Sequence, residues 1–229
     1  MCAHYEALAD QERYAKYFRI ERPYAGAMWP KHVYPTALAP LIRRPHEQSS
    51  GDDAVLAVEV VSGYFGLLPG FAKDTKYGLR TYNARTETVA ELASFKQAWA
   101  KSRHCIVPCE AIYEPDWRTG KHVPTRITRA DDAPLGIAGL WSPWKNPITG
   151  EWLNSFTMLT INADAHPLFK QLHRPDKSRP ANLQDKRMVV ILNDDAYDAW
   201  LDAPLAKSKD FFIQYPAKEL VAMAFQKEL

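Results

Sequence analysis

The feature that most constrains the fold of this chain is a series of short β-type runs in its second half. Each run is apolar or β-branched, and turn signals such as Thr-Gly-Lys and Asn-Pro-Ile-Thr-Gly lie between them. The runs lie at 104–114, 123–129, 135–141, 156–162 and 188–192. We therefore predict an α+β fold, a single domain over residues 1–229 with a largely antiparallel, barrel-like β core flanked by helices.

The first half is predicted to supply two helices and one strand. Residues 6–19 have a helix-favouring composition and no Gly or Pro. A second helix is predicted to start at Thr86 or Thr88, because apolar residues follow at helical spacing. These residues are Val89, Leu92, Phe95 and Trp99. Between the two helices, residues 54–68 predict a buried strand with a bend at Gly63.

Two further patterns predict local structure. Prolines between residues 22 and 46 predict extended pieces over the surface in place of a helix. They are Pro23, Pro30, Pro35, Pro40 and Pro45. Near the other end of the chain, Asn193 is predicted to cap a short helix at 194–201.

Composition excludes several classes of protein. The chain is 46% hydrophobic and 24% charged, as ordinary globular proteins are, so intrinsic disorder is not expected. No apolar run approaches the ~20 residues of a membrane helix, and the N-terminus lacks the pattern of a signal peptide. Three cysteines cannot form an all-paired disulfide framework. These observations predict a cytoplasmic protein, and a net charge of +2 does not by itself indicate nucleic-acid binding.

The second residue is the first candidate for chemistry. If Met1 is removed, Cys2 carries a free α-amine and a thiol on adjacent carbons. These groups titrate near ~7.7–8.0 and ~8.5, so both are partly nucleophilic at neutral pH. Such a pair condenses with an aldehyde to an imine and then to a thiazolidine. The thiol could instead attack an acyl carbon, as in N-terminal nucleophile hydrolases.

Three polar residues could support this chemistry. Asn83 lies at a predicted strand-to-helix junction, where its amide could hold a substrate or the chain terminus. Glu114 lies in an apolar stretch, and burial there would raise its pKa and suit it to proton transfer. His173 precedes a strand, and imidazole is the natural acid or base near pH 7. His166 is the competing histidine for the same role.

A zinc site is the main alternative use of the cysteines. Cys105 and Cys109 are four positions apart, and His104 and His122 are near in the sequence. A structural zinc site commonly uses two close pairs of ligands, and the second pair is missing here. The two cysteines also lie in an apolar run, where a free thiol packs as a small hydrophobic group. We therefore predict no metal site.

Basic residues gather in one segment. Between Lys170 and Arg187 there are six Lys or Arg and two Asp, which leaves +4. Such a segment could follow a phosphate backbone, and an equally simple interpretation is a solvated loop.

Taken in order along the chain, these residues resemble the SOS-response-associated peptidase family of abasic-site-processing proteins. The resemblance runs to about Asp202 and depends on the order and spacing of short pieces. The pieces are Met1-Cys2, Gly66-Leu67-Leu68-Pro69-Gly70, Asn83-Ala84-Arg85-Thr86-Glu87-Thr88, Tyr113-Glu114, and His173 followed later by Arg187-Met188. The chain departs from the family pattern at Ala3-His4, where Gly-Arg is usual, and in the long interval 174–186 after His173.

The resemblance implies a covalent function. Family members bind single-stranded DNA and capture abasic sites, which here implies a thiazolidine between Cys2, freed of Met1, and the ring-opened sugar aldehyde. Asn83 would position the new terminus, and Glu114 would assist the chemistry. His173 would protonate the sugar ring oxygen and help to reverse the crosslink.

The resemblance also implies a DNA-binding set. Arg85 would contact DNA and Phe71 would pack on a base, and the basic segment adds Arg174 and Arg187. The implied partner is single-stranded DNA with abasic sites, bound by a monomer without a cofactor. Two other functions stay open: an N-terminal cysteine peptidase or amidohydrolase that processes its own Met1, and a single-stranded DNA-binding module that never reacts.

Overall fold

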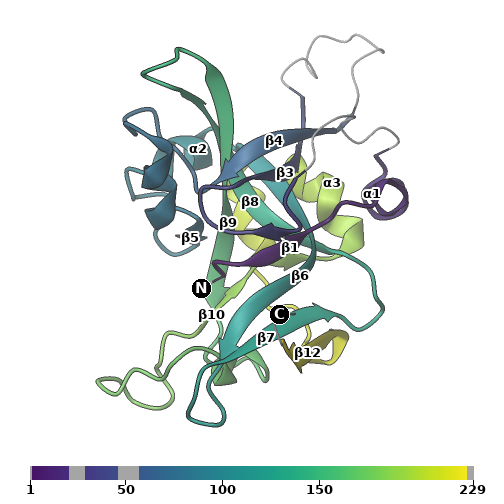
Figure 1. The fold of residues 1–229 in the computed structure, drawn as a ribbon, viewed down its shortest axis with the longest axis vertical. Helices are drawn as coiled ribbons and strands as arrows, with labels where there is room; N and C mark the ends of the chain where they lie inside the picture. Colours follow the sequence, from purple (N-terminus) through teal and green to yellow (C-terminus); the bar gives the residue numbers. More distant parts are fainter. Residues whose placement is uncertain (1, 21–28, 46–56, 226–229) are drawn as a thin grey trace.

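The computed structural model describes residues 2–20, 29–45 and 57–225, and its main feature is a closed ring of five strands (Figure 1). The order around the ring is β8, β9, β4, β3 and β6, and β6 pairs again with β8. In that order the strands span Leu135–Lys145, Trp152–Asn162, Glu59–Phe65, Leu38–Arg43 and His104–Asp116. All the ring pairs are antiparallel except β4 with β9. The predicted α+β fold with a barrel-like, largely antiparallel core is therefore confirmed.

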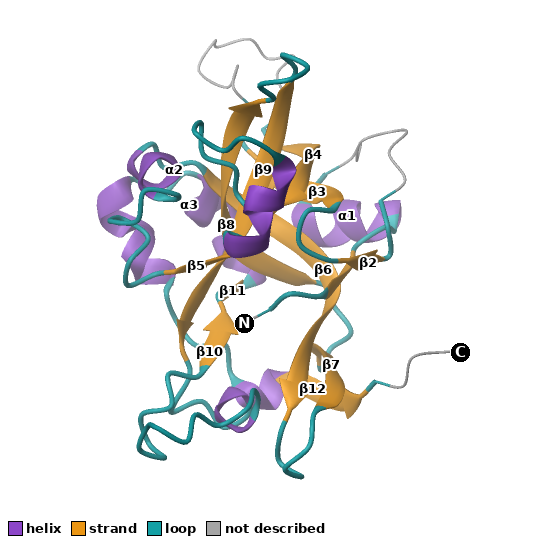
Figure 2. Cartoon of the chain, turned by 60° about the vertical axis from the view of Figure 1, so that its left-hand side comes forward, coloured by secondary structure: helices purple, strands orange, loops and turns teal. Residues whose placement is uncertain are grey.

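Shorter strands extend this ring, and helices lie around it (Figure 2). The middle of β6 pairs with β1 and its C-terminal end with β7, while β9 also pairs with β5 and β10. The short strands are β1 (Tyr5–Ala7), β2 (His32–Val33), β5 (Asn83–Arg85), β7 (Val123–Arg129), β10 (Arg187–Val189), β11 (Ile191–Leu192) and β12 (Leu220–Ala224). The α-helices are α1 (Gln11–Phe18), α2 (Lys96–Ala100) and α3 (Tyr197–Leu201).

The core lies on both sides of the longest strands. Most residues of β8 and β9 are buried, so both faces of these strands contribute to the core. On the outside, Trp200 of α3 is fully buried, and its indole N–H donates to the Cys105 carbonyl at 2.9 Å. The Cys105 and Cys109 thiols are both buried in β6, so these residues pack as part of the core.

The N-terminal segment differs from the helix predicted over 6–19. Tyr5–Ala7 form β1, which pairs with β2 and β6, and only Gln11–Phe18 are helical. Asp10 begins this helix, since its carboxylate accepts hydrogen bonds from two backbone N–H groups of the first turn. The pairing of Tyr5–Ala7 with two strands outweighs the helix propensity of the residues that come before Gln11.

The helix predicted near 86–99 is shorter than expected. Residues 86–95 form turns, and α2 spans only Lys96–Ala100. At the start of the turns, the backbone N–H of Thr86 donates to the Thr160 carbonyl of β9 at 3.0 Å. This bond continues the pairing of β5 with β9, so the chain is still extended where the sequence predicts a helix cap.

The proline-rich segment and the next strand also differ from expectation. Leu38–Arg43 form β3 within the ring, so this part lies in the core and not on the surface. Residues 21–28 and 46–56, which include parts of both predictions, lie outside the described residues. At Gly63, where the sequence predicts a bend, β4 continues in register and Gly63 lies opposite Ala39 of β3.

The cap predicted at Asn193 is wrong in its detail. A 3-10 turn at Asp194–Ala196 precedes α3, and the Asn193 side chain makes no cap hydrogen bond. In the described ranges, no helix is long and apolar enough to cross a membrane.

A close approach of two glycines gives a first testable prediction. Gly66 follows β4 with φ +124°, and a Cβ there would lie 2.4 Å from the Gly78 Cα. We expect Gly66→Ala to lower the free energy of unfolding by about 2–4 kcal/mol through backbone strain and steric overlap. Urea denaturation measures this change. Gly70→Ala is the matched control, because a Cβ on Gly70 meets nothing within 4 Å, and equal losses in both variants would contradict the prediction.

Candidate functional site

The end of β6 provides a buried carboxylate. Glu114 lies opposite Thr125 of β7 and is 2% exposed. Burial raises the pKa of its carboxyl to about 7, because the ionised form is poorly solvated there. The burial predicted from the apolar sequence around Glu114 is therefore confirmed. A carboxyl with this pKa exchanges a proton at neutral pH, as a general acid or base must.

His173 lies directly beside this carboxylate. Leu172 forms an isolated β-bridge with Asp116, and the His173 backbone N–H donates to the Pro115 carbonyl at 2.7 Å. The segment thus adds to the edge of β6 and brings His173 Nε2 to 3.2 Å from Glu114 Oε2. Burial lowers the pKa of the imidazole to about 3, so the ring is neutral at pH 7. In this pair the group that titrates near pH 7 is therefore Glu114. The sequence alone favours His173 as the acid or base near that pH.

A buried lysine holds His173 in place. Lys186 Nζ donates to the carbonyls of Leu172 and His173 at 2.6 and 2.7 Å. His173 has φ of 61°, a left-handed conformation that is uncommon for a residue other than glycine. Lys186 belongs to the basic segment that could follow a phosphate backbone, but its side chain is buried. Its two hydrogen bonds instead stabilise the backbone that presents His173.

Cys2 is buried within range of the charge of the same carboxylate. Its thiol donates to the His4 carbonyl at 3.4 Å, and the backbone N–H of Tyr113 donates to that carbonyl at 2.9 Å. The residues before β1 therefore run beside β6. Burial, and then the charge of Glu114, raises the pKa of the Cys2 thiol above its ordinary range. The thiol is consequently protonated at neutral pH, in place of the partial thiolate that the sequence suggests.

Asn83 opens β5, close to this group. Its preceding residue, Tyr82, has a phenol whose pKa is raised by burial and then by Glu114 and Cys2. The Asn83 amide N–H donates to the Tyr82 carbonyl at 2.9 Å, and its Oδ1 is buried without a hydrogen-bond partner among the described residues. That oxygen is a ready acceptor for an N–H group. Tyr82 is a site residue that the sequence does not predict. The one feature of the sequence that points to it is its position beside Asn83.

His166, the competing histidine, is occupied elsewhere. Its Nδ1 accepts the backbone N–H groups of Leu168 and Phe169, both at 3.1 Å. Its Nε2 therefore carries the proton, which it donates to the Tyr215 carbonyl at 2.8 Å. Both ring nitrogens of this buried residue hold the backbone, whereas His173 faces Glu114.

Two of the three arginines predicted to bind DNA, Arg85 and Arg187, lie beside each other but differ in exposure. Arg85 is half-exposed and pairs with Asp185 at 2.6 Å. Arg187 is 4% exposed, and its guanidinium binds both oxygens of Glu87 at 2.7 Å. A phosphate could replace Asp185 on Arg85 at the surface. Contact with Arg187 would first require the Glu87 pair to open.

The other two predicted DNA-binding residues are exposed. The guanidinium of Arg174 lies over the Trp117 ring, 5.6 Å from its centroid. Phe71 is 57% exposed and meets Tyr77 edge-on at 5.6 Å. Both present flat, accessible groups, as contacts to single-stranded nucleic acid require.

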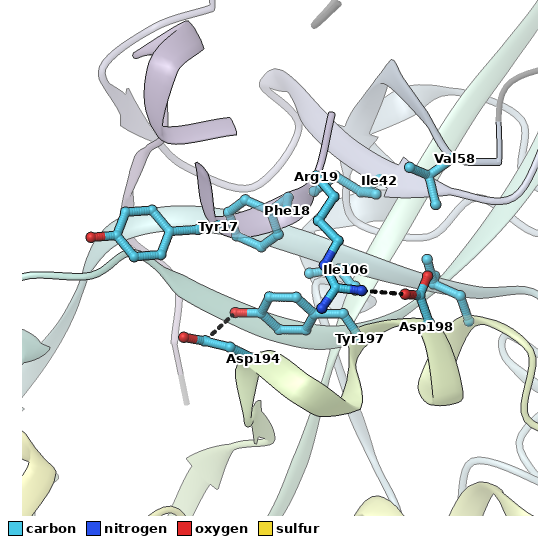
Figure 3. Close-up of a pocket in the computed structure, with 10 residues that line it drawn as sticks. Tyr17, Phe18, Arg19, Ile42, Val58, Ile106, Asp194, Tyr197 and Asp198 are labelled. Atoms are coloured by element: carbon cyan, nitrogen blue, oxygen red, sulfur yellow. Dashed lines mark hydrogen bonds and ion pairs between the residues drawn. The ribbon is translucent and has the colours of Figure 1, made fainter. Parts of the chain in front are cut away.

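A separate small cavity lies between α1 and α3 (Figure 3). Its polar side chains bind one another: Tyr197 donates to Asp194 at 3.0 Å, and Arg19 pairs with Asp198 at 3.4 Å. None of the predicted site residues lines this cavity. Among the described residues, no three His, Cys, Asp or Glu side chains are grouped as a metal site.

Comparison with known proteins gives a consistent match. The family model described as "SOS response associated peptidase (SRAP)" matches residues 1–229. The abasic site processing protein YobE of Bacillus subtilis is 33% identical over 141 residues, 60% of this chain and 56% of its own length. The abasic site processing protein HMCES of Xenopus tropicalis is 26% identical over 191 residues, 74% of this chain and 52% of its own length. The chain thus spans little more than half of these relatives.

Solved structures match the fold over nearly the whole chain. A crystal structure of a Bordetella bronchiseptica protein is 47% identical, with a TM-score of 0.83 over 98% of this chain and 100% of that one. A Bacteroides thetaiotaomicron protein has a TM-score of 0.75 at 20% identity, over 99% of this chain and 93% of that one. At that identity the second likeness concerns the fold alone.

Proposed function

Since this chain belongs to the SOS response associated peptidase family, we propose that it captures abasic sites in single-stranded DNA as a covalent adduct of Cys2. The relatives named abasic site processing proteins support abasic DNA as the partner. The observation that carries the proposal is the group formed by Cys2, Glu114 and His173: the Glu114 carboxylate lies 3.2 Å from the His173 imidazole, and its charge helps to raise the pKa of the buried Cys2 thiol. We further propose that the protein acts as a monomer in the cytoplasm.

The proposed chemistry starts when hydrolysis of the Met1–Cys2 bond frees the Cys2 α-amine. The amine nitrogen attacks the aldehyde carbon of the ring-opened sugar, the aldehyde oxygen leaves as water, and an imine forms. The Cys2 sulfur then bonds to the imine carbon, and the thiol proton passes to the nitrogen. A five-membered thiazolidine closes with net loss of one water. Because the thiol is buried and protonated, its addition needs a neighbouring base to relay that proton.

The surrounding residues fit distinct roles in this proposal. Glu114, with a pKa near 7, relays protons to and from the amine, and neutral His173, whose Nε2 lies 3.2 Å from that carboxyl, assists release by holding the carboxyl in position. The free Oδ1 of Asn83 accepts a hydrogen bond from the Cys2 amine. Arg85 and Arg174 contact phosphates.

Intact mass after incubation with an abasic oligonucleotide tests the proposal. The expected species has the mass of the protein without Met1, plus the oligonucleotide, minus one water. A peptidase or amidohydrolase would lose Met1 and give no adduct. A module that only binds DNA would also give no adduct, and its binding would survive Cys2→Ala. Absence of a denaturant-stable adduct would therefore overturn the proposed function.

Arg85 gives a prediction about salt dependence. We expect Arg85→Gln to weaken binding of single-stranded DNA several-fold and to reduce the slope of log K against log salt by about 0.7, because one phosphate contact is lost. Fluorescence anisotropy at several salt concentrations measures both. Arg19→Gln is the matched control, since Arg19 is an exposed arginine that also pairs with an aspartate. An Arg85→Gln slope equal to that of the control would contradict the contact.

A further inference from the structure

Three aromatic rings form a continuous stack beside the candidate site. The His4 ring lies between the rings of Tyr113 and Tyr34, at centroid distances of 4.0 and 4.3 Å. The planes are nearly parallel, with interplanar angles of 10° and 16°. These spacings are those of stacked aromatic groups. The stack therefore runs outward from β6 in the order Tyr113, His4, Tyr34.

The inner two rings are held by hydrogen bonds. His4 Nε2 lies 3.0 Å from Nδ1 of His32 on β2, and the Tyr113 hydroxyl donates to Glu6 at 3.2 Å. Tyr113 is buried, whereas Tyr34 at the outer end is 52% exposed. Hydrogen bonds thus fix the two inner rings, and the stack ends in the ring of Tyr34, which is accessible to solvent.

A hollow of about 300 Å³ adjoins this stack and shares a wall with the candidate site. Its lining includes all three stacked residues and also residue Glu114, whose buried carboxylate contacts His173. This volume is at the lower end of the range for small-molecule sites, about 300–1,000 Å³. A flat group in the hollow would lie beside Glu114, a residue of the site where we propose that the sugar aldehyde reacts.

Charge beside the stack favours an anionic strand. Glu6 pairs with two cations, Lys31 at 3.2 Å and Arg126 at 3.1 Å. Arg126 is opposite Tyr113 in the β6–β7 pair. One carboxylate with two cations leaves a local excess of +1, as a phosphate would require.

We propose that Tyr34, backed by His4 and Tyr113, stacks the nucleobase next to the abasic nucleotide. This inference rests on the proposed function and adds to it a subsite for the neighbouring base. An abasic nucleotide has no base, so the nearest flat groups that could enter a hollow beside Glu114 belong to its neighbours. Every base has an aromatic face, so this contact anchors the strand without selecting its sequence.

Binding to oligonucleotides with a tetrahydrofuran residue tests this subsite, because this abasic analogue has no aldehyde and cannot react. One oligonucleotide keeps both neighbouring bases, and two others replace the 5′ or the 3′ neighbour with a second tetrahydrofuran. We expect the wild-type Kd to rise about tenfold when one of the two neighbours is removed. Removal of the base that does not enter the hollow should leave Kd unchanged.

Tyr34→Ala should bind the intact-neighbour oligonucleotide about tenfold more weakly and lose the discrimination. Tyr34→Phe keeps the ring and should behave as the wild type. A wild type that ignores both neighbours, or a Tyr34→Ala protein that still discriminates, would overturn the subsite. The covalent proposal is tested separately by the mass of the adduct with aldehyde-containing DNA. Base-dependent binding without that adduct would overturn the chemistry and support the subsite.

Discussion

Replacing Cys2 with alanine is expected to abolish covalent capture of abasic DNA completely while changing non-covalent affinity less than about threefold. The alanine variant has an α-amine but no sulfur, so it stops at a reversible imine. Phosphate contacts dominate affinity for single-stranded DNA, and the buried Cys2 side chain makes none. Denaturing electrophoresis with an abasic oligonucleotide measures capture, and anisotropy with the tetrahydrofuran analogue measures affinity.

Cys2→Ser separates the two steps of the reaction. It keeps the amine and a polar side chain, so it should give an adduct only when a borohydride reductant traps the imine. A stable adduct of Cys2→Ala without reductant would show that another residue reacts.

Glu114→Gln is expected to slow adduct formation about 10²-fold or more, the usual contribution of a positioned acid or base. Because burial raises the pKa of Glu114 to about 7, its carboxylate becomes available as pH rises through that value. The single-turnover rate of the wild type at saturating DNA should therefore increase through an inflection near pH 7. In Glu114→Gln this inflection should disappear, and the same inflection in both proteins would exclude Glu114 as the group responsible.

Stability gives an independent measure of the same carboxyl. The pKa of Glu114 is higher in the folded protein than its ordinary value, so the folded state binds this proton more tightly than the unfolded state. The resulting stabilisation is present at low pH and is lost as pH rises through about 7. The free energy of unfolding of the wild type, relative to Glu114→Gln, should accordingly fall between about pH 4.5 and pH 7.

The histidines provide a matched pair for crosslink release. His173→Ala should slow transfer of a preformed adduct to fresh abasic DNA, since His173 contacts Glu114. His166→Ala should instead lower the melting temperature, because both ring nitrogens of His166 bind the backbone. Slow release in a fully folded His166→Ala protein, with normal release in His173→Ala, would reverse the two assignments.

The sequence predicts the long β-runs well, because β6, β8 and β9 are rich in apolar and β-branched residues, are buried over most of their length and are bounded by turns. It does not predict β1 and β5, which have three residues each and are extended only because longer strands pair with them. Local composition cannot report such a partner.

In the candidate site, too, the sequence predicts some features and not others. Burial of Glu114 follows from its apolar neighbours, whereas the neutral state of His173 depends on a loop conformation and a buried lysine from a later segment. The functional roles of Cys2, Asn83, Glu114 and His173 stay predictions, as do those of Arg85, Arg174, Arg187 and Phe71.

The two hydrogen bonds from Lys186 also have a consequence for how this protein tolerates insertions. Residues 175–183 are exposed between His173 and Lys186, and the lysine joins the two ends of this loop directly. Doubling the length of such a closed loop costs only about 0.6 kcal/mol. Residues 175–183 are therefore a natural place for a length variation or an engineered tag, with the imidazole still at its place beside Glu114.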